Sequence, residues 1–181
     1  RFTMAQVADG PAGFANCMKL TTTTADTSIA AGEILVIQQG FEGQDLQQIY
    51  KGVSGAKQLT VSFYVKGNAS ATYNGRIASQ EFAVTTDWNR IELTFAADED
   101  DGSSPFDDDN AQSLTLIFIL HAGSTFTGGT FVSNTWANQT NNIRASDSQT
   151  SIFDSTDRTF FITGVQMEIG ATATEFEHRS Y

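Results

Sequence analysis

The strongest constraint on this chain is a strict alternation of apolar and polar residues in QLTVSFYVKG, residues 58–67. From Leu59 to Val65 every second residue is apolar, and the residues between and after them include Thr60, Ser62 and Lys66. A period of two is typical of a β-strand with one buried face, because successive side chains point to opposite sides of a sheet. The run therefore predicts a strand that contributes one face to a hydrophobic core.

Other runs follow the same rule. NRIELTFA at 89–96 alternates in the same way, and SLTLIFILHA at 113–122 is apolar on both faces, as in a central strand. We expect about eight to ten short strands, with one or two helical turns in EGQDLQQIYKG from Glu42, where Leu46, Ile49 and Tyr50 have helical spacing and Gly52 ends the turns. The other candidate strands are 14–20, 33–39, 129–136, 149–153 and 160–169, and segments rich in turn-forming residues lie at 50–57, 66–75, 97–110 and 121–129.

The composition supports the same fold class. The 181 residues include 14 Phe and only 2 Pro, with many Thr, and aromatic and β-branched residues favour strands. The length suits one domain. We predict a single all-β domain over residues 1–181, an antiparallel β-sandwich of jelly-roll type, and we expect a piece of a larger chain because it starts at Arg1. The expected core contains Leu59, Val61, Phe63, Ile91, Leu93, Phe95, Leu116, Phe118, Val165 and Met167.

The charge excludes several classes of partner. The formal net charge is −11, and 10 Lys and Arg residues do not supply a basic patch for nucleic acid or for an anionic membrane. LIFIL at 116–120 is the longest apolar run and is too short to insert into a bilayer. The single Cys17 reads as a small buried hydrophobe, and His121 as a core or rim residue, because one cysteine and two histidines do not make a usual zinc site.

The last residues gather chemically active side chains. Glu175, Glu177 and His178 end the chain within a few positions of one another. In a strand, the two carboxylates would share a face about 7 Å apart, which is compatible with a glycosidase pair. A terminal strand holds catalytic geometry poorly, and charges on an edge strand prevent edge-to-edge pairing. We therefore favour a structural interpretation, with Phe176 packed inward and Arg179 in an ion pair, and we assign no catalytic residue.

An acidic segment, ADEDDGSSPFDDDN, spans residues 97–110. Calcium prefers six to eight oxygen ligands, so a structural calcium site is one interpretation, although the register does not match an EF-hand loop. A solvated connection between strands is the interpretation that we favour. The candidate calcium ligands are Asp98, Asp100, Asp107 and Asp109, and we expect no other cofactor.

Aromatic residues in polar surroundings are the candidates for sugar binding. The C–H face of a pyranose stacks on an exposed Trp or Tyr, and amide side chains fix the hydroxyls. Trp136 in SNTWANQTNN has this setting, whereas Trp88 reads as a residue that packs the sandwich. An ordinary polar loop, or a subunit contact anchored by one Trp, is the alternative. The candidate sugar-binding residues are Trp136, Asn134, Asn138, Gln139, Tyr64 and Tyr73.

Two resemblances follow from these runs. QLTVSFYVKG, TTDWNRIELTFA and FFITGVQMEIG resemble the strands of jelly-roll carbohydrate-binding modules of secreted polysaccharide-degrading enzymes. Thr163 and Gly164 stand where those modules have an Asp pair. MKLTTTTADTSIAAGE, SLTLIFILHAGSTFTGGTF and ITGVQMEIGATATEFEHRSY resemble a domain of tail-fibre and other virion proteins of tailed bacteriophages, with Glu175 where that family usually has Pro.

The second resemblance implies a non-catalytic virion domain, assembled in the host cytoplasm and carried on the extracellular particle. Its expected work is attachment to a host-surface glycan, to other virion proteins, or to both, and the resemblance implies a homotrimer. One alternative is a capsid or tail decoration protein that binds only virion subunits. A second is a glycan depolymerase, for which the sequence offers no marked carboxylate spacing. A secreted bacterial carbohydrate-binding module is a third, which the phage-like closing run disfavours.

Overall fold

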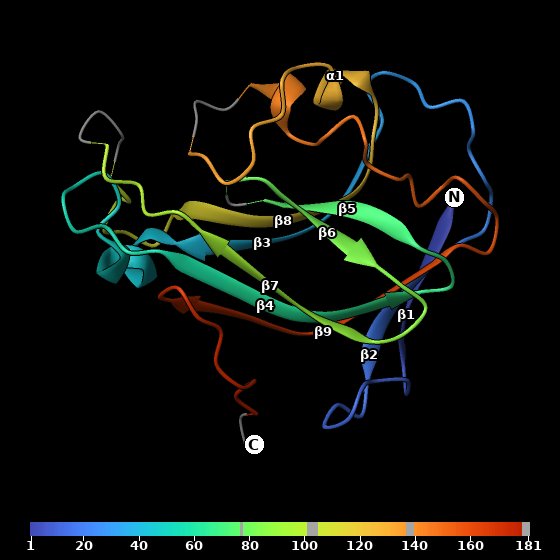
Figure 1. The fold of residues 1–181 in the computed structure, drawn as a ribbon, viewed down its shortest axis with the longest axis horizontal. Coiled ribbons are helices and arrows are strands. Elements are labelled where there is room, and N and C mark those ends of the chain that lie inside the picture. Colours follow the sequence, from blue (N-terminus) through green and yellow to red (C-terminus); the bar gives the residue numbers. More distant parts are fainter. Residues whose placement is uncertain (77, 101–104, 137–139, 179–181) are drawn as a thin grey trace.

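The chain forms two antiparallel sheets packed face to face (Figure 1). The computed structural model describes residues 1–76, 78–100, 105–136 and 140–178. One sheet has five strands in the order β1-β2-β9-β4-β7, and the other has four in the order β3-β8-β5-β6. The strands are β1 (Phe2–Val7), β2 (Cys17–Thr22), β3 (Ile34–Glu42), β4 (Leu59–Gly67), β5 (Ala71–Arg76), β6 (Gln80–Val84), β7 (Asn89–Phe95), β8 (Gln112–Ala122) and β9 (Thr159–Ile169).

The strand pairings are nested, and this defines the topology. β2 pairs with β9, β3 with β8, β4 with β7 and β5 with β6, all antiparallel. The chain is therefore folded as a long hairpin that is rolled into two sheets, with further pairs β4–β9 and β5–β8 closing each sheet. This is the jelly-roll arrangement of two Greek keys, with β1 added at one edge. The predicted fold class, an all-β antiparallel sandwich, is confirmed.

The core between the sheets follows the alternation in the sequence. In β4, Leu59, Val61, Phe63 and Val65 are all at most 2% exposed. The ring of Phe63 makes edge contacts with rings of the opposite sheet, at 5.1 Å from Phe82 and 4.9 Å from Phe118. Apart from Ile91 and Met167, which are partly buried against the core, and Val165, which is 43% exposed, the predicted core residues are buried.

Val165 was expected in the core, and the structure corrects this prediction. It follows Gly164, whose φ of +60° accompanies a register shift in the β4–β9 pairing. Because β2 pairs with β9 only as far as Ile162, the second half of β9 has β4 on one side and no strand on the other. Val165 consequently lies at an open edge between the two sheets.

Some elements were wrongly predicted. Residues 129–136 and 149–153 are not strands, although Ile152 and Phe153 are buried. The segment 66–75, which was expected to be a turn, contributes most of β5, because pairing with β6 and β8 on its two sides outweighs its turn-forming residues. β1 and β6 were not anticipated. The short helix was predicted at the correct position, and it is a 3-10 helix, η1 (Gly43–Ile49).

Two further short helices, α1 (Ser124–Thr127) and η2 (Asn141–Ile143), lie in the long connection between β8 and β9. This connection covers one end of the sandwich, at the top of Figure 1. Within the described residues, no helix has the length and apolar character that a membrane crossing needs.

Candidate functional site

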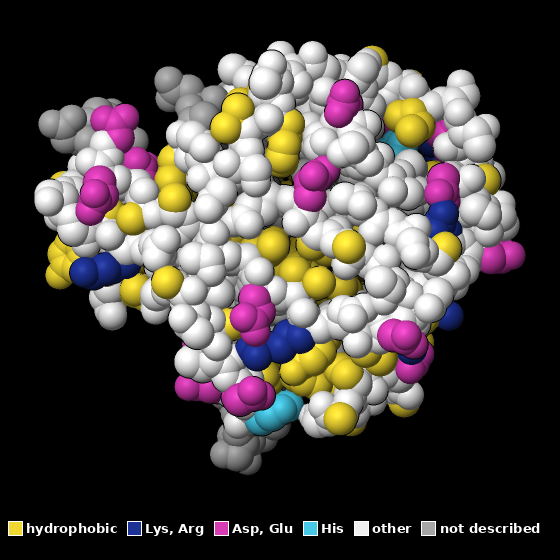
Figure 2. Space-filling model, in the orientation of Figure 1, with side chains coloured by type: hydrophobic (Ala, Val, Ile, Leu, Met, Phe, Trp, Pro, Cys, Tyr) yellow, Lys and Arg dark blue, Asp and Glu magenta, His cyan; other side chains and the backbone are white. Residues whose placement is uncertain are grey.

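An open cleft lies at the end of the sandwich where η1 meets the loops that follow β7 and precede β8. Its volume is about 360 Å³. Figure 2 shows hydrophobic side chains next to charged ones at this end of the molecule, on the left. The lining combines apolar, amide and aromatic side chains, from Leu46, Gln47, Gln48, Tyr50, Lys51, Val53, Pro105 and Phe106.

Tyr50 is the exposed aromatic side chain of this cleft. It caps η1 in the left-handed conformation, with a φ of 54°, and its backbone N–H donates to the carbonyl of Gln47. The turn directs the ring outward, and 59% of the residue is exposed, whereas Leu46 and Ile49 are buried beneath it. Helical spacing in the sequence grouped Tyr50 with these two apolar residues. The Gly52 that follows is the signal that the helix ends here and that Tyr50 escapes the buried face.

Lys51 fixes the floor of the cleft. Its Nζ lies 3.1 Å from the carboxylate of Asp98 and 5.8 Å from the ring centroids of both Phe106 and Trp136. Asp98 is only 7% exposed. The ion pair of Lys51 with the buried Asp98, and the stacking of Lys51 on the two rings, therefore join η1 to two loops that are distant from it in sequence.

Trp136 has a structural position beside this cleft. Its indole N–H donates to the carbonyl of Ala96 at 2.6 Å, and the ring is partly buried against the core. Asn134 adopts a φ of 55°, and its side-chain oxygen accepts a hydrogen bond from the N–H of Ala96 at 2.9 Å. Neither of these predicted residues lines the cleft: Trp136 contacts it through Lys51, and Asn134 fixes the backbone at Ala96. Asn138 and Gln139 lie outside the described residues.

The two glutamine side chains of η1 that line the cleft have different roles. Gln47 uses its Nε2 to bond the carbonyls of Gly43, Phe106 and Asp107, and so ties the loop before β8 to the helix. Gln48 is exposed and lines the cleft. The cleft thus presents the ring and hydroxyl of Tyr50 and two exposed amide residues, of which Gln47 is already bonded to three carbonyls, over a floor in which Lys51 is paired with Asp98.

The two other predicted tyrosines lie elsewhere. Tyr73 is 1% exposed, and its ring packs edge-on against Phe160 at 5.5 Å in the core. Burial raises the pKa of its hydroxyl far above the ordinary value. Its assignment to a sugar site is therefore wrong, because β5 is an interior strand and not a loop. Tyr64 lies on the outer face of β4, half-buried, with its ring 5.2 Å from that of Phe14.

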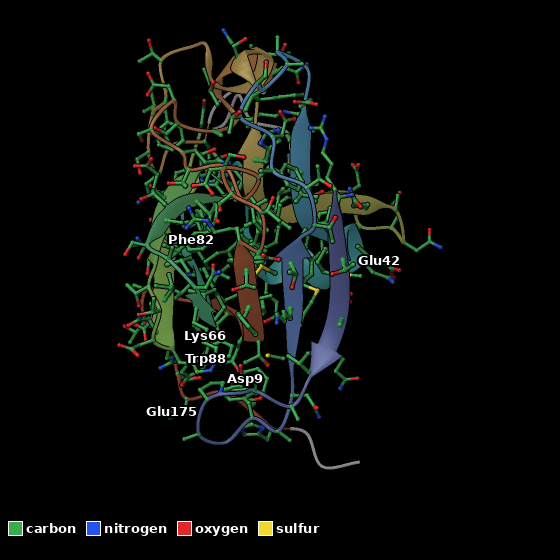
Figure 3. The ribbon with its side chains drawn as sticks, turned by 90° about the vertical axis from the view of Figure 1, so that its right-hand side faces the viewer. Asp9, Glu42, Lys66, Phe82, Trp88 and Glu175 are labelled. Atoms are coloured by element: carbon green, nitrogen blue, oxygen red, sulfur yellow. The ribbon has the colours of Figure 1, made fainter. Side chains whose placement is uncertain are left out.

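The outer face of the five-stranded sheet carries a second aromatic cluster. Lys66 stacks between the rings of Trp88 and Phe161, at 5.1 and 4.9 Å, and forms an ion pair with Asp9 at 2.8 Å. Figure 3 shows Asp9, Lys66 and Trp88 close together at one end of the sheet. Because Lys66 stacks on the indole of Trp88 and also pairs with Asp9, this cluster attaches the loop that contains Asp9 to the sheet.

The closing run is an irregular segment and not the strand that was expected. Phe176 packs against Phe14 at 4.9 Å on the outer face of the sheet, and not into the core. The N–H of Glu177 donates to the side chain of Gln166 at 2.9 Å, and that of Thr174 to Glu168 at 3.1 Å. The segment therefore lies along β9. Arg179 is outside the described residues.

The four predicted calcium ligands do not converge. Asp98 is committed to Lys51, and Asp109 accepts a hydrogen bond from the N–H of Ala111. Across the parts of the chain that the structure describes, no group of three or more His, Cys, Asp or Glu side chains is placed to hold a metal ion. Asp100 and Asp107 join no such group, so the hypothesis of a calcium site in these residues is not supported.

Comparison with known proteins gives no family by sequence: no family model and no curated protein matches the chain. Similar solved structures include a CBM4 domain, which is 12% identical, with 90% of each chain covered and a TM-score of 0.43. The CBM22-1 xylan-binding domain from Paenibacillus barcinonensis Xyn10C is 12% identical, with 95% of this chain and 83% of that one covered and a TM-score of 0.41. The enzymatically active domain of bacteriophage CBA120 tailspike protein 4 is 12% identical, with 93% of this chain and 18% of that one covered and a TM-score of 0.46.

Proposed function

We propose that this chain is a non-catalytic domain of a tailed-phage particle that binds a surface glycan, and that the cleft beside η1 holds one neutral sugar ring. The observation that carries the proposal is Tyr50, an aromatic ring that is 59% exposed on the rim of a concave site. An exposed tyrosine offers a π face to sugar C–H groups and a hydroxyl to sugar oxygens.

The electrostatics of the cleft favour a neutral ligand. Lys51 is paired with Asp98, so the one lysine that lines the cleft carries little free charge toward a ligand. The chain as a whole has a net charge of −11, which repels an acidic polysaccharide. Neutral hexoses with free hydroxyls therefore suit Tyr50 and Gln48 better than uronic or sialic acids do.

The location on a virion is the second part of the proposal. It is supported by the resemblance of the closing run and of residues 113–131 to phage tail-fibre domains, and labelling this chain in intact particles tests it. A position at a fibre tip agrees with attachment. A position on the shell favours the decoration protein that binds only virion subunits.

A glycan array probed with the isolated domain tests the binding function. We expect binding to a small set of neutral glycans, loss of that binding in Tyr50→Ala, and retention in Tyr50→Phe, which keeps the ring. Ile29→Ala, a change at an exposed loop residue away from the cleft, serves as the control. An array that stays silent for the wild-type chain would overturn the proposal, and shortening of any glycan chain would overturn its non-catalytic part.

A further inference from the structure

Val53 is an exposed apolar residue that lines the cleft beside η1. It is 47% exposed and follows Tyr50 by three positions in the chain. A single apolar side chain on a protein surface is common and needs no explanation of its own. Val53 is different because it lines the same concave site as the exposed ring of Tyr50, and because the turn that carries it is fixed.

Backbone hydrogen bonds hold the turn that contains Val53 at both of its ends. At the start of the turn, the N–H of Gly52 donates to the carbonyl of Asp98 at 2.7 Å. After the turn, the N–H of Lys57 donates to the carbonyl of Ile49 at 2.8 Å. A valine side chain is also stiff at χ1. Val53 therefore presents its methyl groups in a nearly fixed place, and a ligand that contacts them loses little binding free energy in immobilising the side chain.

The lining of the cleft is markedly apolar for a site that holds a sugar. Five of its eight residues are aliphatic or aromatic, namely Leu46, Tyr50, Val53, Pro105 and Phe106. Among the three polar residues, Gln47 already bonds three carbonyls, and Lys51 is paired with Asp98. Gln48, which is exposed, carries the amide that is open to a ligand. The cleft therefore offers few hydrogen-bonding groups beside a large apolar surface.

We propose that the cleft selects a neutral sugar that carries a methyl group, and that this methyl packs against Val53. The inference rests on the proposed glycan-binding function and names the class of sugar. A sugar hydroxyl placed against Val53 would lose its bonds to water and find no partner, which costs free energy, whereas a methyl placed there leaves water at a gain. Two classes of neutral sugar supply such a methyl: 6-deoxyhexoses at C6, and N-acetylhexosamines on the acetamido group.

The other lining residues suit both classes of sugar. Tyr50 offers its ring to the C–H face of the sugar, and Gln48 offers its amide to the hydroxyls. Because Lys51 is paired with Asp98, the cleft calls for no charge on the ligand, and both classes are neutral. An N-acetylhexosamine brings an amide that Gln48 can bond, and a 6-deoxyhexose has one hydroxyl fewer to satisfy. Both therefore fit a cleft with few polar groups better than an unsubstituted hexose does.

Titration of the chain with matched pairs of free sugars, followed by NMR, tests this selection. L-fucose is paired with L-galactose, L-rhamnose with L-mannose, and N-acetylglucosamine and N-acetylgalactosamine each with the N-formyl analogue, which lacks only the methyl. In at least one pair we expect the methyl-bearing sugar to bind about fourfold more tightly, the equivalent of about 0.8 kcal/mol for one buried group. The pair that shows the preference identifies the class of sugar. Equal dissociation constants within every pair overturn the inference.

A substitution tests whether the methyl lies against Val53. Val53→Thr keeps the shape of the side chain and replaces one methyl with a hydroxyl, so it should lower the preference to about twofold or less. Val132→Thr is the same change at a residue that is 53% exposed and does not line the cleft, and it should keep the full preference. Circular dichroism should show that both variants fold. A preference that survives unchanged in Val53→Thr overturns the contact.

The same titrations separate this inference from the glycan-binding function on which it rests. If sugars bind, and Tyr50→Ala abolishes their binding, but no pair shows a preference, the selection for a methyl fails and the function stands. If no sugar binds to the wild-type chain, both fail.

Discussion

The Nζ of Lys51 lies 3.1 Å from the carboxylate of Asp98, and both side chains are largely buried, at 15% and 6% exposure. Lys51 follows the end of η1, whereas Asp98 follows β7, so one ion pair joins two segments that form the base of the cleft. The backbone repeats this link, because the N–H of Gly52 donates to the carbonyl of Asp98 at 2.7 Å.

Asp98→Ala should destabilise the protein by about 3 kcal/mol, because removal of one partner leaves a lysine that is poorly solvated. The same change should weaken glycan binding, since the floor below Tyr50 loses its fixed position. Urea unfolding measures the first effect. Asp108→Ala, at an exposed residue of the same acidic segment, should change stability by a few tenths of a kcal/mol. Equal effects of the two substitutions would contradict this account of the ion pair.

A glycine is required at position 164, both by the backbone conformation there and by the side chains that surround it. Its φ is +60°, and an added Cβ would lie 2.7 Å from the ring of Phe14. Gly164→Ala should cost about 1–2 kcal/mol for the left-handed backbone alone, with a further loss from displacement of Phe14. Gly32→Ala, where an added Cβ meets nothing within 4 Å, is the control. Thermal unfolding that ranks the two variants as equal would show that the contact with Phe14 is not tight.

The pH dependence of stability should depend on His121. The residue is 1% exposed, and its Nδ1 lies 2.7 Å from the Oγ of Ser151. Burial lowers the pKa of His121 below its ordinary 6.5, although Glu33, 3.8 Å away, acts in the opposite direction. The unfolded chain therefore binds a proton at a higher pH than the folded chain does, and stability is lost as the pH falls below 6.5.

Unfolding free energies measured in urea between pH 7.5 and pH 5 test this expectation. The slope from one histidine is at most about 1.4 kcal/mol per pH unit, and His121→Gln should reduce the slope of the wild type. His178→Gln, at the other histidine, which is exposed, is the matched control for the loss of an imidazole. A slope that persists in His121→Gln would assign the pH dependence to carboxylates.

The sequence predicted the part of the fold that alternation controls. β4 and β7 showed their buried faces as apolar residues at every second position, and β8 was visible as a strand that is apolar on both faces. β9 was found as a strand, but its expected core face fails at Val165, after the register shift at Gly164. β5 was missed because its TYNG run is typical of a turn, and only its two neighbouring strands make it extended. β1 was missed because it has no buried face to mark it.

The sequence predicted a residue near the candidate site, but not the residues that form the site. Trp136 was singled out as the candidate for sugar stacking, but the structure places it behind the cleft, against Lys51, with its N–H bonded to the carbonyl of Ala96. Tyr50 was assigned to the apolar face of a helix, since a spacing of four residues from Leu46 hides a left-handed cap. The pairing of Lys51 with Asp98 joins residues 47 positions apart and has no local signal in the sequence.

The most direct test of the account is a calorimetric titration with the neutral glycan that binds best on the array, using wild type, Tyr50→Phe and Tyr50→Ala. The account predicts similar affinities for the first two proteins. It predicts a loss of about tenfold or more for Tyr50→Ala, because about 1.4 kcal/mol of stacking energy is removed. Unchanged affinity in a folded Tyr50→Ala variant would contradict the assignment of the glycan site to this cleft.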